Sequence, residues 1–515
     1  MMSYRLPDVN RHSTVDERVA PCIELTMHAI DRITYVSTHR RESLLRYFTI
    51  SLILICGSVT RAADKPNLLF LFADDQAYHT IHAMGNDEIR TPNLDRLFKR
   101  GTSFTHAHNQ GGWNGAICIA SRTMLNTGLY LWHAHAVDTK LKTEWVPQKR
   151  LWAQQLSSAG YQTFFSGKWH VKADADSVFE VARNVRGGMP NQTAAGYNRP
   201  ISRDDDAWKP WDRSFEGFWK GGKHWSEVLG DDGVEYMNIA ARDERPFFMY
   251  LAFNAPHDPR QSPKEFVDMY PADRIAVPAS FLPEYPYDIG SNRIRDEKLA
   301  PFPRTQFAVQ VNRQEYYAII THMDQQIGRI LDALEETGQA ENTWIIFTAD
   351  HGLGCGNHGL LGKQNMFDHS MRVPFAVVGP GVEADRRIGM RIYLQDAMAT
   401  TLELAGATIP DHVEFNSLLP FLESGSEQVT GTVYGGYTET QRSVTVDHEK
   451  LVLYPKINVS LLFDLNEDPD ERRDLSSRDG SHARKKVLFR EFLTQQKVVG
   501  DRLNVTNAFP ELAAP

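Results

Sequence analysis

Cysteine is scarce in this chain: among 515 residues only Cys22, Cys56, Cys118 and Cys355 are cysteines. Four widely spaced cysteines do not form the framework of a small disulfide-stabilised protein. If an N-terminal segment is removed, only Cys118 and Cys355 remain, and a bridge between these two is the pairing left open. With 42% hydrophobic residues, the chain has ample material to be held together by a core instead.

Positive charge is also in deficit. The chain has 56 Lys and Arg residues against 65 Asp and Glu residues, a formal net charge of −9. Such a chain has no overall basic field, so nucleic acid is not an expected partner. An anionic substrate would have to be bound by locally placed cations. The sequence also shows no internal repeat and no strong low-complexity tract.

Long apolar runs are absent, which argues against a stable membrane span. The run Phe48–Cys56 is too short, but three arginines lie between residues 40 and 46 and small residues follow it. A basic flank, a short apolar segment and small residues are typical of a secretory signal, although a buried strand is the alternative. We therefore expect a signal peptide near residues 40–63 and a secreted or periplasmic protein.

Short apolar runs are frequent, and they read as strands buried on both faces, as in a parallel sheet. Helical patterns separate them, including one that ends at Gly338 and makes Met323 a core residue. We expect strands at 67–73, 161–166, 246–253, 344–348 and 373–378. We expect helices at 91–98 (capped by Thr91), 151–156, 316–334 and 393–404, and mostly long loops over 171–235 and 259–305.

Polar residues follow four of these apolar runs. They are Asp74, Asp75, Lys168, His170, His257, Asp350 and His351. Open parallel sheets place ligands at the carboxyl ends of their strands, so these side chains are expected to converge on one crevice. Any one of them is also compatible with an ordinary turn. A shared site explains all of them more economically.

The stretch Cys118–Arg122 follows the glycine-rich loop 111–115 and opens a helical pattern that Gly128 ends. A cysteine at a helix start lies among unsatisfied backbone N–H groups, which favour negative charge and lower the pKa of the thiol. The alternative is a buried structural cysteine that only fills space.

Seven short motifs, in order along the chain, resemble those of the sulfatase family. The stretch Cys118–Arg122 resembles the family's Cys-x-Pro-Ser-Arg signature, with Ala120 at the proline position. The others resemble its Asp-Asp pair, Gly-Lys-Trp-His, Pro-His, Asp-His-Gly, Gly-Lys and Asp-Leu-x-x-Asp-Pro motifs. Here they are Asp74–Asp75, Gly167–His170, Pro256–His257, Asp350–Gly352, Gly362–Lys363 and Asp464–Pro469. Ordered motifs over this length are specific, although each alone is weak.

The resemblance implies a secreted enzyme of the alkaline-phosphatase-like superfamily that hydrolyses a sulfate monoester. In this family the signature cysteine is oxidised to formylglycine, which makes a formylglycine-generating enzyme a partner of this chain during maturation. The hydrated aldehyde attacks sulfur through one hydroxyl, and loss of the second hydroxyl's proton expels sulfate and restores the aldehyde. A plain serine lacks that second hydroxyl.

The resemblance also implies which residues form the site. One divalent metal ion would be held by Asp74, Asp75, Cys118, Asp350 and His351. Three carboxylates suit Ca²⁺; because histidine is a less typical Ca²⁺ ligand, Mg²⁺ and Mn²⁺ remain open. The implied catalytic residues are Cys118, Arg122, Lys168, His170, His257 and Lys363, with His358 a weaker candidate. Arg122 and Lys168 would steady the hydrate, His257 and Lys363 would face the sulfate and the leaving oxygen, and His170 would take the proton.

Two other functions stay open at this point. Phosphonate monoester or phosphodiester hydrolases share the fold and can share the formylglycine, although one metal-ligand set rather than two favours sulfate. A non-catalytic relative that only binds the anion is the alternative of a different class. The substrate, a sulfated small molecule or polysaccharide, is not readable. A carbohydrate is suggested only by Trp208, Trp211, Trp219 and Trp225, which either stack on sugar rings or pack as amphipathic surface residues.

The expected fold is α/β: a large, mostly parallel sheet between helices, followed by a smaller C-terminal α+β domain with a short antiparallel sheet. Short alternating segments at 432–437, 443–446, 450–454 and 461–465, then a helix at 485–495, predict the second domain. We expect an N-terminal extension and signal at 1–63, a catalytic domain at 64–425 and the smaller domain at 426–515.

Overall fold

The computed structural model describes residues 65–190, 194–197 and 199–514; the expected signal segment, with Cys22 and Cys56, lies outside them. Its centre is a nine-stranded sheet in the order β10-β2-β9-β7-β1-β6-β4-β5, with β8 paired to β2. The strands are β1 Asn67–Asp74, β2 Thr102–His108, β4 Gln162–Lys168, β5 Val181–Arg186, β6 Phe247–Pro256, β7 Thr343–Ala349, β8 Arg372–Val373, β9 Phe375–Val378 and β10 Arg386–Tyr393.

Most neighbours in this sheet are parallel, as the continuous apolar runs predict. β1 pairs in parallel with β6 and β7, and β4 pairs in parallel with β5 and β6. The exceptions are β9, which runs antiparallel to both β7 and β2, and the short β8, which runs antiparallel to β2. Parallel strands need long crossover connections, which here are helices.

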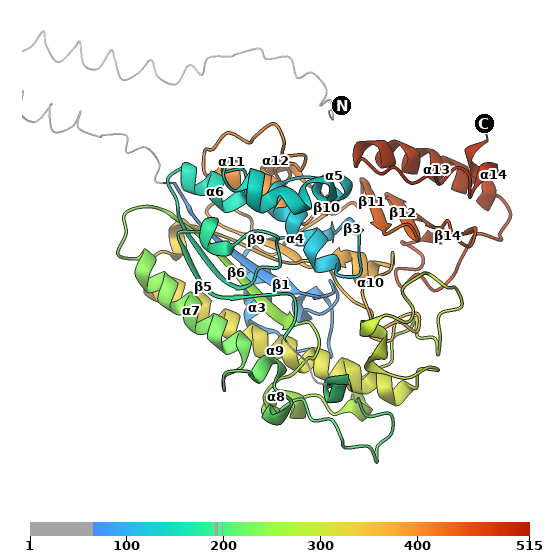
Figure 1. The fold of residues 1–515 in the computed structure, drawn as a ribbon, viewed down its shortest axis with the longest axis horizontal. Coiled ribbons are helices and arrows are strands. Elements are labelled where there is room, and N and C mark those ends of the chain that lie inside the picture. The colour runs from blue at the N-terminus through green and yellow to red at the C-terminus, as the bar shows by residue number, and fades with distance from the viewer. Residues whose placement is uncertain (1–64, 191–193, 198, 515) are drawn as a thin grey trace, which may run out of the picture. The chain divides into compact units, whose positions relative to one another are not determined.

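Helices cover both faces of the sheet (Figure 1). One layer holds α4 Ile117–Thr127, α5 Leu131–Val137, α6 Trp152–Ser158 and α11 Asp396–Leu404, and the other holds α3 Pro92–Arg100, α7 Trp225–Ala240 and α9 Gln306–Glu336. The shorter helices are α8 Lys264–Asp268, α10 Asp368–Met371, α12 Leu419–Ser424 and α14 Pro510–Ala513. Every residue of β1 is buried because both of its faces are covered.

A second, five-stranded sheet has the order β14-β13-β12-β11-β3. Four of its strands are antiparallel: β11 Thr432–Tyr437, β12 Gln441–Val446, β13 Glu449–Tyr454 and β14 Val459–Asp464, followed by helix α13 Ser481–Val498. The fifth is β3 Gly111–Gly112, which pairs in parallel with the end of β11. Position 111 of β3 requires glycine, because a Cβ there would lie 2.1 Å from the carbonyl oxygen of Gly436. This sheet therefore reaches the loop that leads into α4.

The fold class expected from the sequence is confirmed, but several elements differ. The helix expected at 393–404 begins only at Asp396, because Arg386–Tyr393 forms β10. The region 171–235, expected to consist of long loops with short elements, contains β5 as a short element, but α7, which begins at Trp225, is longer than expected. Thr91 does not cap α3: its hydroxyl instead donates to Asp95 and accepts from the backbone of His82.

Within the described ranges, no helix combines the length and apolar character that crossing a bilayer requires. Cys118 and Cys355 are both free and buried, so the bridge left open by the sequence is not formed.

Candidate active site

Strand register brings the predicted carboxylates together. Ala73 of β1 lies opposite Ala349 of β7, and Asp74 lies opposite Pro256 of β6, so the residues that follow these strands emerge at one edge. The backbone N–H of Asp75 donates to Asp350 Oδ1 at 3.1 Å. Asp74, Asp75 and Asp350 are all at most 2% exposed.

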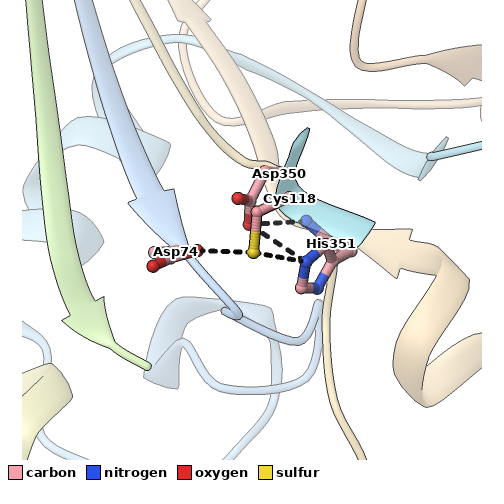
Figure 2. Close-up of side chains that lie close together, drawn as sticks. All are labelled: Asp74, Cys118, Asp350 and His351. Carbon is pink, nitrogen blue, oxygen red and sulfur yellow. Dashed lines mark hydrogen bonds and ion pairs between the residues drawn. The ribbon is translucent and has the colours of Figure 1, made fainter. Parts of the chain in front are cut away.

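Cys118 lies in the first turn of α4 and points its thiol at this edge. Its Sγ lies 3.5 Å from Asp74 Oδ1, 4.0 Å from Asp75 Oδ1 and 3.4 Å from His351 Nε2. Figure 2 shows the sulfur between Asp74 on one side and His351 on the other, with Asp350 behind it. The neighbouring Ser121 donates to the carbonyl oxygen of Asp350 at 2.8 Å, which ties α4 to the end of β7.

Three cations neutralise part of this negative charge. Arg122 Nε donates to Asp350 Oδ2 at 3.0 Å, and Lys168 Nζ pairs with Asp74 Oδ2. Lys363 Nζ lies 2.7 Å from Asp75 Oδ2 and 3.5 Å from Cys118 Sγ. Arg122 is fully buried behind the carboxylates, whereas Lys363 reaches the thiol directly.

Two histidines complete the set. His257 is buried, and its Nε2 lies 3.7 Å from Asp75 Oδ2. Burial lowers the pKa of His257, but the carboxylates of Asp75, Asp258 and Asp74 together outweigh it and raise the pKa to about 10. His170 lies close enough to the Cys118 thiol to hydrogen bond, and its burial lowers its own pKa.

The thiol of Cys118 is activated by these cations. Burial alone would raise its pKa, but Lys168, Lys363 and His351 hold the pKa well below its usual value. A lowered thiol pKa agrees with the sequence expectation, and Lys168, Lys363 and His351 are its causes among the side chains.

The donor set fits a divalent metal ion. Ligand atoms of Asp74, Cys118, Asp350 and His351 lie within 4.8 Å of one another, and a second group joins Asp74, Asp75, Cys118 and His257. His351 Nδ1 donates to the carbonyl oxygen of Gly352 at 2.9 Å, so Nε2 faces the site and would become a metal ligand on losing its proton. Burial, Asp350 and Cys118 raise the pKa of Asp74 well above its usual value. A cation would relieve that excess of negative charge.

The structure thus brings together every predicted site residue: Asp74, Asp75, Cys118, Arg122, Lys168, His170, His257, Asp350, His351 and Lys363. The weaker candidate His358 lies elsewhere, stacked on Phe367 with ring centroids 3.9 Å apart and bonded to the carbonyl oxygen of Glu471.

Sequence reasoning missed Tyr316 and Asp258. Tyr316 of α9 donates through its hydroxyl to the carbonyl oxygen of Asp75 at 2.5 Å and accepts from the backbone of Ala77 at 2.9 Å. Asp258 Oδ1 lies 2.9 Å from His257 Nδ1. Adjacency to His257 was a signal for Asp258, but helical periodicity marks Tyr316 only as core.

The rings of the four tryptophans considered for sugar stacking are each covered by a cationic side chain of this chain. Trp208 and Trp219 are 4% exposed. A cation lies over each ring: Arg199 over Trp208 at 4.1 Å, Lys264 over Trp211 at 5.2 Å, Arg213 over Trp219 at 5.0 Å and Arg186 over Trp225 at 4.0 Å. This geometry favours packing over sugar stacking, and the hint of a carbohydrate substrate loses its support from these residues.

Comparison with known proteins gives a family match over most of the described chain. The Sulfatase family model matches residues 66–407, and the model for the C-terminal part of N-sulphoglucosamine sulphohydrolase matches residues 356–498. An arylsulfatase of Clostridium perfringens is 26% identical over 87% of this chain and 98% of its own length. An ulvan-active sulfatase of Formosa agariphila is 26% identical over 86% of this chain and 82% of its own length.

Solved structures share the fold. A protein in complex with its substrate D-glucosamine-2-N,6-O-disulfate superposes with a TM-score of 0.66 and 20% identity, covering 85% of this chain and 99% of the other. A phosphonate monoester hydrolase of Agrobacterium radiobacter superposes with a TM-score of 0.65 and 20% identity, covering 84% and 95%.

Proposed function

This chain belongs to the sulfatase family and is a sulfuric ester hydrolase, and from that premise we propose that it hydrolyses sulfate monoesters of carbohydrates. In this proposal residue 118 is a formylglycine, made from Cys118 by a formylglycine-generating enzyme, and one divalent metal ion serves the site. The observation that carries the proposal is the convergence of the Cys118 thiol with three carboxylates, two lysines and three histidines at one buried edge of the sheet.

The metal ion would be held by Asp74, Asp75, Asp350, His351 and residue 118. Bound there, it would supply Lewis acidity that lowers the pKa of an attacking hydroxyl and draws charge from the sulfate oxygens. Three carboxylates favour Ca²⁺, and one imidazole keeps Mg²⁺ and Mn²⁺ within the proposal.

The proposed roles of the other residues follow from their positions. Arg122 and Lys168 hold the carboxylates of Asp350 and Asp74 from behind and so fix the ligand set. Lys363 and His257 both pair with Asp75, and in this proposal they donate to a sulfate oxygen or to the departing alkoxide. His170, next to Cys118, is placed to accept the proton of the second hydroxyl, which releases sulfate and restores the aldehyde.

Support for a carbohydrate substrate comes from the relatives. One similar protein is named for activity on ulvan, and one similar structure holds a glucosamine disulfate as its substrate. We further propose that the chain is exported by the signal at residues 40–63, and that residues 64–425 and 426–515 are its catalytic and smaller domains.

The experiment combines modification, metal and substrate in one preparation. The protein is produced together with a formylglycine-generating enzyme, and the peptide that contains residue 118 is analysed by mass spectrometry. Turnover is then measured on sulfated mono- and disaccharides, nitrophenyl sulfate and a phenyl phosphonate monoester. Each assay is run after chelation and after return of Ca²⁺, Mg²⁺ or Mn²⁺.

We expect an aldehyde at residue 118, loss of turnover on chelation with recovery on metal return, and a preference for sulfated sugars. Cys118→Ala should remove nearly all turnover, whereas Cys355→Ala, at the other buried free thiol, should keep it. Full activity with unmodified Cys118, or turnover in rigorously metal-free protein, would refute the mechanism. Preference for the phosphonate monoester over every sulfate would replace the substrate assignment.

A further inference from the structure

The imidazole of His257 is held by the residue that follows it. Its Nδ1 lies 2.8 Å from the carbonyl oxygen of Asp258 and 2.9 Å from Asp258 Oδ1. Both atoms accept hydrogen bonds at this position, so Nδ1 is the donor and the ring has one orientation that satisfies it. In that orientation Nε2 is directed at the site and lies 3.7 Å from Asp75 Oδ2.

Asp258 is itself fixed by groups on other segments. It is 3% exposed, and Arg295 Nη2 donates to its Oδ1 at 3.2 Å while the Tyr197 hydroxyl lies 3.4 Å from its Oδ2. A buried carboxylate is costly unless cations and hydrogen-bond donors surround it. The cation of Arg295 therefore stabilises the buried carboxylate of Asp258 in its observed position.

Arg295 is also linked to Lys363, the other proposed proton donor, through Asp296 and Gln364. Its Nε donates to Asp296 Oδ1 at 2.9 Å, and Asp296 Oδ2 accepts from Gln364 Nε2 at 2.9 Å. Gln364 Oε1 in turn accepts from the backbone N–H of Lys363 at 3.0 Å. The guanidinium of Arg295 thus binds two carboxylates. Asp258 contacts the His257 ring, and Asp296 is linked through Gln364 to the backbone N–H of Lys363.

Arg295 is far more exposed than the two carboxylates it binds, unlike an arginine that stabilises a buried core. Its side chain is 38% exposed, whereas those of Asp258 and Asp296 are 4% and 7% exposed. A half-exposed arginine contributes little to global stability through an ion pair alone. Its placement between the two proton donors of the site points to a local, orienting effect.

We propose that Asp258 is a positioning residue that fixes the His257 ring with Nε2 toward the reaction centre, and that Arg295 holds Asp258 in place. The proposal rests on the role given above to His257 as a donor to the leaving oxygen. Asp258 and Arg295 act through His257 and do not touch the reacting atoms.

The consequence is a loss that depends on the leaving group. A sugar alkoxide needs a proton as it departs, whereas nitrophenolate does not. Asp258→Ala should therefore lower kcat on a sugar sulfate by about 10- to 100-fold, below the 10²- to 10⁴-fold range of a general acid itself. Loss on nitrophenyl sulfate should stay under about threefold, with little change in KM on either substrate.

Two milder variants give a graded test. Asp258→Asn keeps the shape and the Oδ1 acceptor, so it should retain most of the activity that Asp258→Ala loses. Arg295→Gln should resemble a weakened Asp258→Ala. The matched control is Arg293→Gln in the same segment, because Arg293 pairs with Glu284 at the surface and should leave both rates unchanged.

The decisive measurement is a double-mutant cycle with His257→Gln. If Asp258 acts only through His257, then Asp258→Ala should cost nothing further once His257 is replaced. Losses that multiply, or equal losses on sugar and nitrophenyl sulfates, would overturn the proposal. A crystal structure of Asp258→Ala adds a readout without turnover. Only the carbonyl oxygen of residue 258 then still accepts from Nδ1, so the His257 ring should shift from its wild-type orientation, and an unmoved ring would also contradict us.

The sulfate assignment and the role of Asp258 can be refuted independently of each other. If the wild-type enzyme ignores sulfates and cleaves phosphonate monoesters, the sulfate assignment is wrong. The same cycle, measured with alkyl and nitrophenyl phosphonate monoesters, and the same crystal structure still decide whether Asp258 positions His257.

Discussion

At the scale of single residues, His170 depends on the absence of a side chain beside it. A Cβ on Gly188 would lie 2.4 Å from His170 Cε1 and 2.6 Å from Nε2, closer than real Cβ contacts allow. His170 Nδ1 is buried and has no hydrogen-bond partner in the described part of the chain. Packing against Gly188, together with the nearby Cys118 thiol, therefore sets the position of this ring.

We predict that Gly188→Ala displaces His170 and lowers kcat by about 10- to 100-fold, because a general base out of place loses much of its contribution. The Tm of the Gly188→Ala variant should differ from that of the wild-type protein by only a few degrees. Gly187→Ala is the matched control, since nothing lies within 4 Å of a Cβ there. Steady-state kinetics on one sulfate ester compares the two variants, and equal activities would show that His170 tolerates the shift.

At the scale of elements, helix α9 supports the metal-ligand loop after β1. Tyr316 bridges the carbonyl oxygen of Asp75 and the N–H of Ala77 with one hydroxyl, and it is 2% exposed. Asp75 has a φ of 71°, in the left-handed region that costs energy for a residue with a side chain. The two bonds hold the loop in that conformation.

Tyr316→Phe should leave both backbone groups buried without a partner, which costs about 1–3 kcal/mol of stability. Metal affinity should fall by about 10- to 100-fold, as for other groups that orient metal ligands. Tyr317→Phe removes a hydroxyl that contacts Glu88 and Asn86 instead, so it should leave metal affinity unchanged. Calorimetric titration with Ca²⁺ measures both; equal affinities would contradict the role of Tyr316.

At the scale of the whole molecule, buried charges join the second sheet to the site loop. Lys450 of β13 lies 2.8 Å from Asp368 of α10 and 2.7 Å from Glu471. The backbone N–H of Asp368 donates to Glu471 at 2.6 Å. Because residues 350–371 carry Asp350, His351 and Lys363, the smaller sheet helps to hold the loop on which those side chains lie.

Five histidines around this region make the fold acid-sensitive. Burial lowers the pKa of His358 to about 4, those of His79 and His108 to about 3 and that of His106 to about 2, and it lowers the pKa of His369 well below its usual value. The folded protein keeps these rings neutral, while the unfolded chain binds protons near pH 6.5. Stability present above about pH 6.5 is therefore lost as pH falls toward the folded pKa values.

We predict that the free energy of unfolding falls between pH 6.5 and 4 by about 1.4 kcal/mol per pH unit for each such histidine. Urea unfolding at several pH values measures the slope. His369→Gln should reduce the slope of unfolding free energy against pH by the share of one proton. His482→Gln, at an exposed position on α13, should leave the slope unchanged. A slope that is flat in the wild-type protein would contradict the prediction.

Much of the architecture could be predicted because it rests on local pattern. Continuous apolar runs such as 67–73 and 246–253 can only be strands buried on both faces, and β1 and β6 lie there. Since polar residues directly follow these runs, the rule that parallel strands end at one edge was enough to gather Asp74, Asp75, His257 and Asp350. The same rule gathered Lys168, His170 and His351, whereas the resemblance of short motifs supplied Cys118, Arg122 and Lys363.

Other elements were decided by tertiary structure. β10 contains three arginines, Arg386, Arg387 and Arg391, and has no apolar run, yet parallel pairing with β2 stabilises it as a strand. Thr91 has the composition of a cap, but its hydroxyl is taken by His82 and Asp95. Propensity is a weak guide where a stronger partner competes.

The sequence by itself determined the strands β1, β4, β6, β7 and β9, the edge on which the site lies and the chemistry of the residues there, because each shows as a pattern of neighbours close along the chain. Only the tertiary structure decided what orients that chemistry: Tyr316 behind Asp75, Arg295 behind Asp258 and Gly188 against His170. Tyr316 and Asp75 are 241 residues apart in sequence. Contacts across such separations leave no periodic signal, since they arise only when packed elements bring the two segments within hydrogen-bond distance.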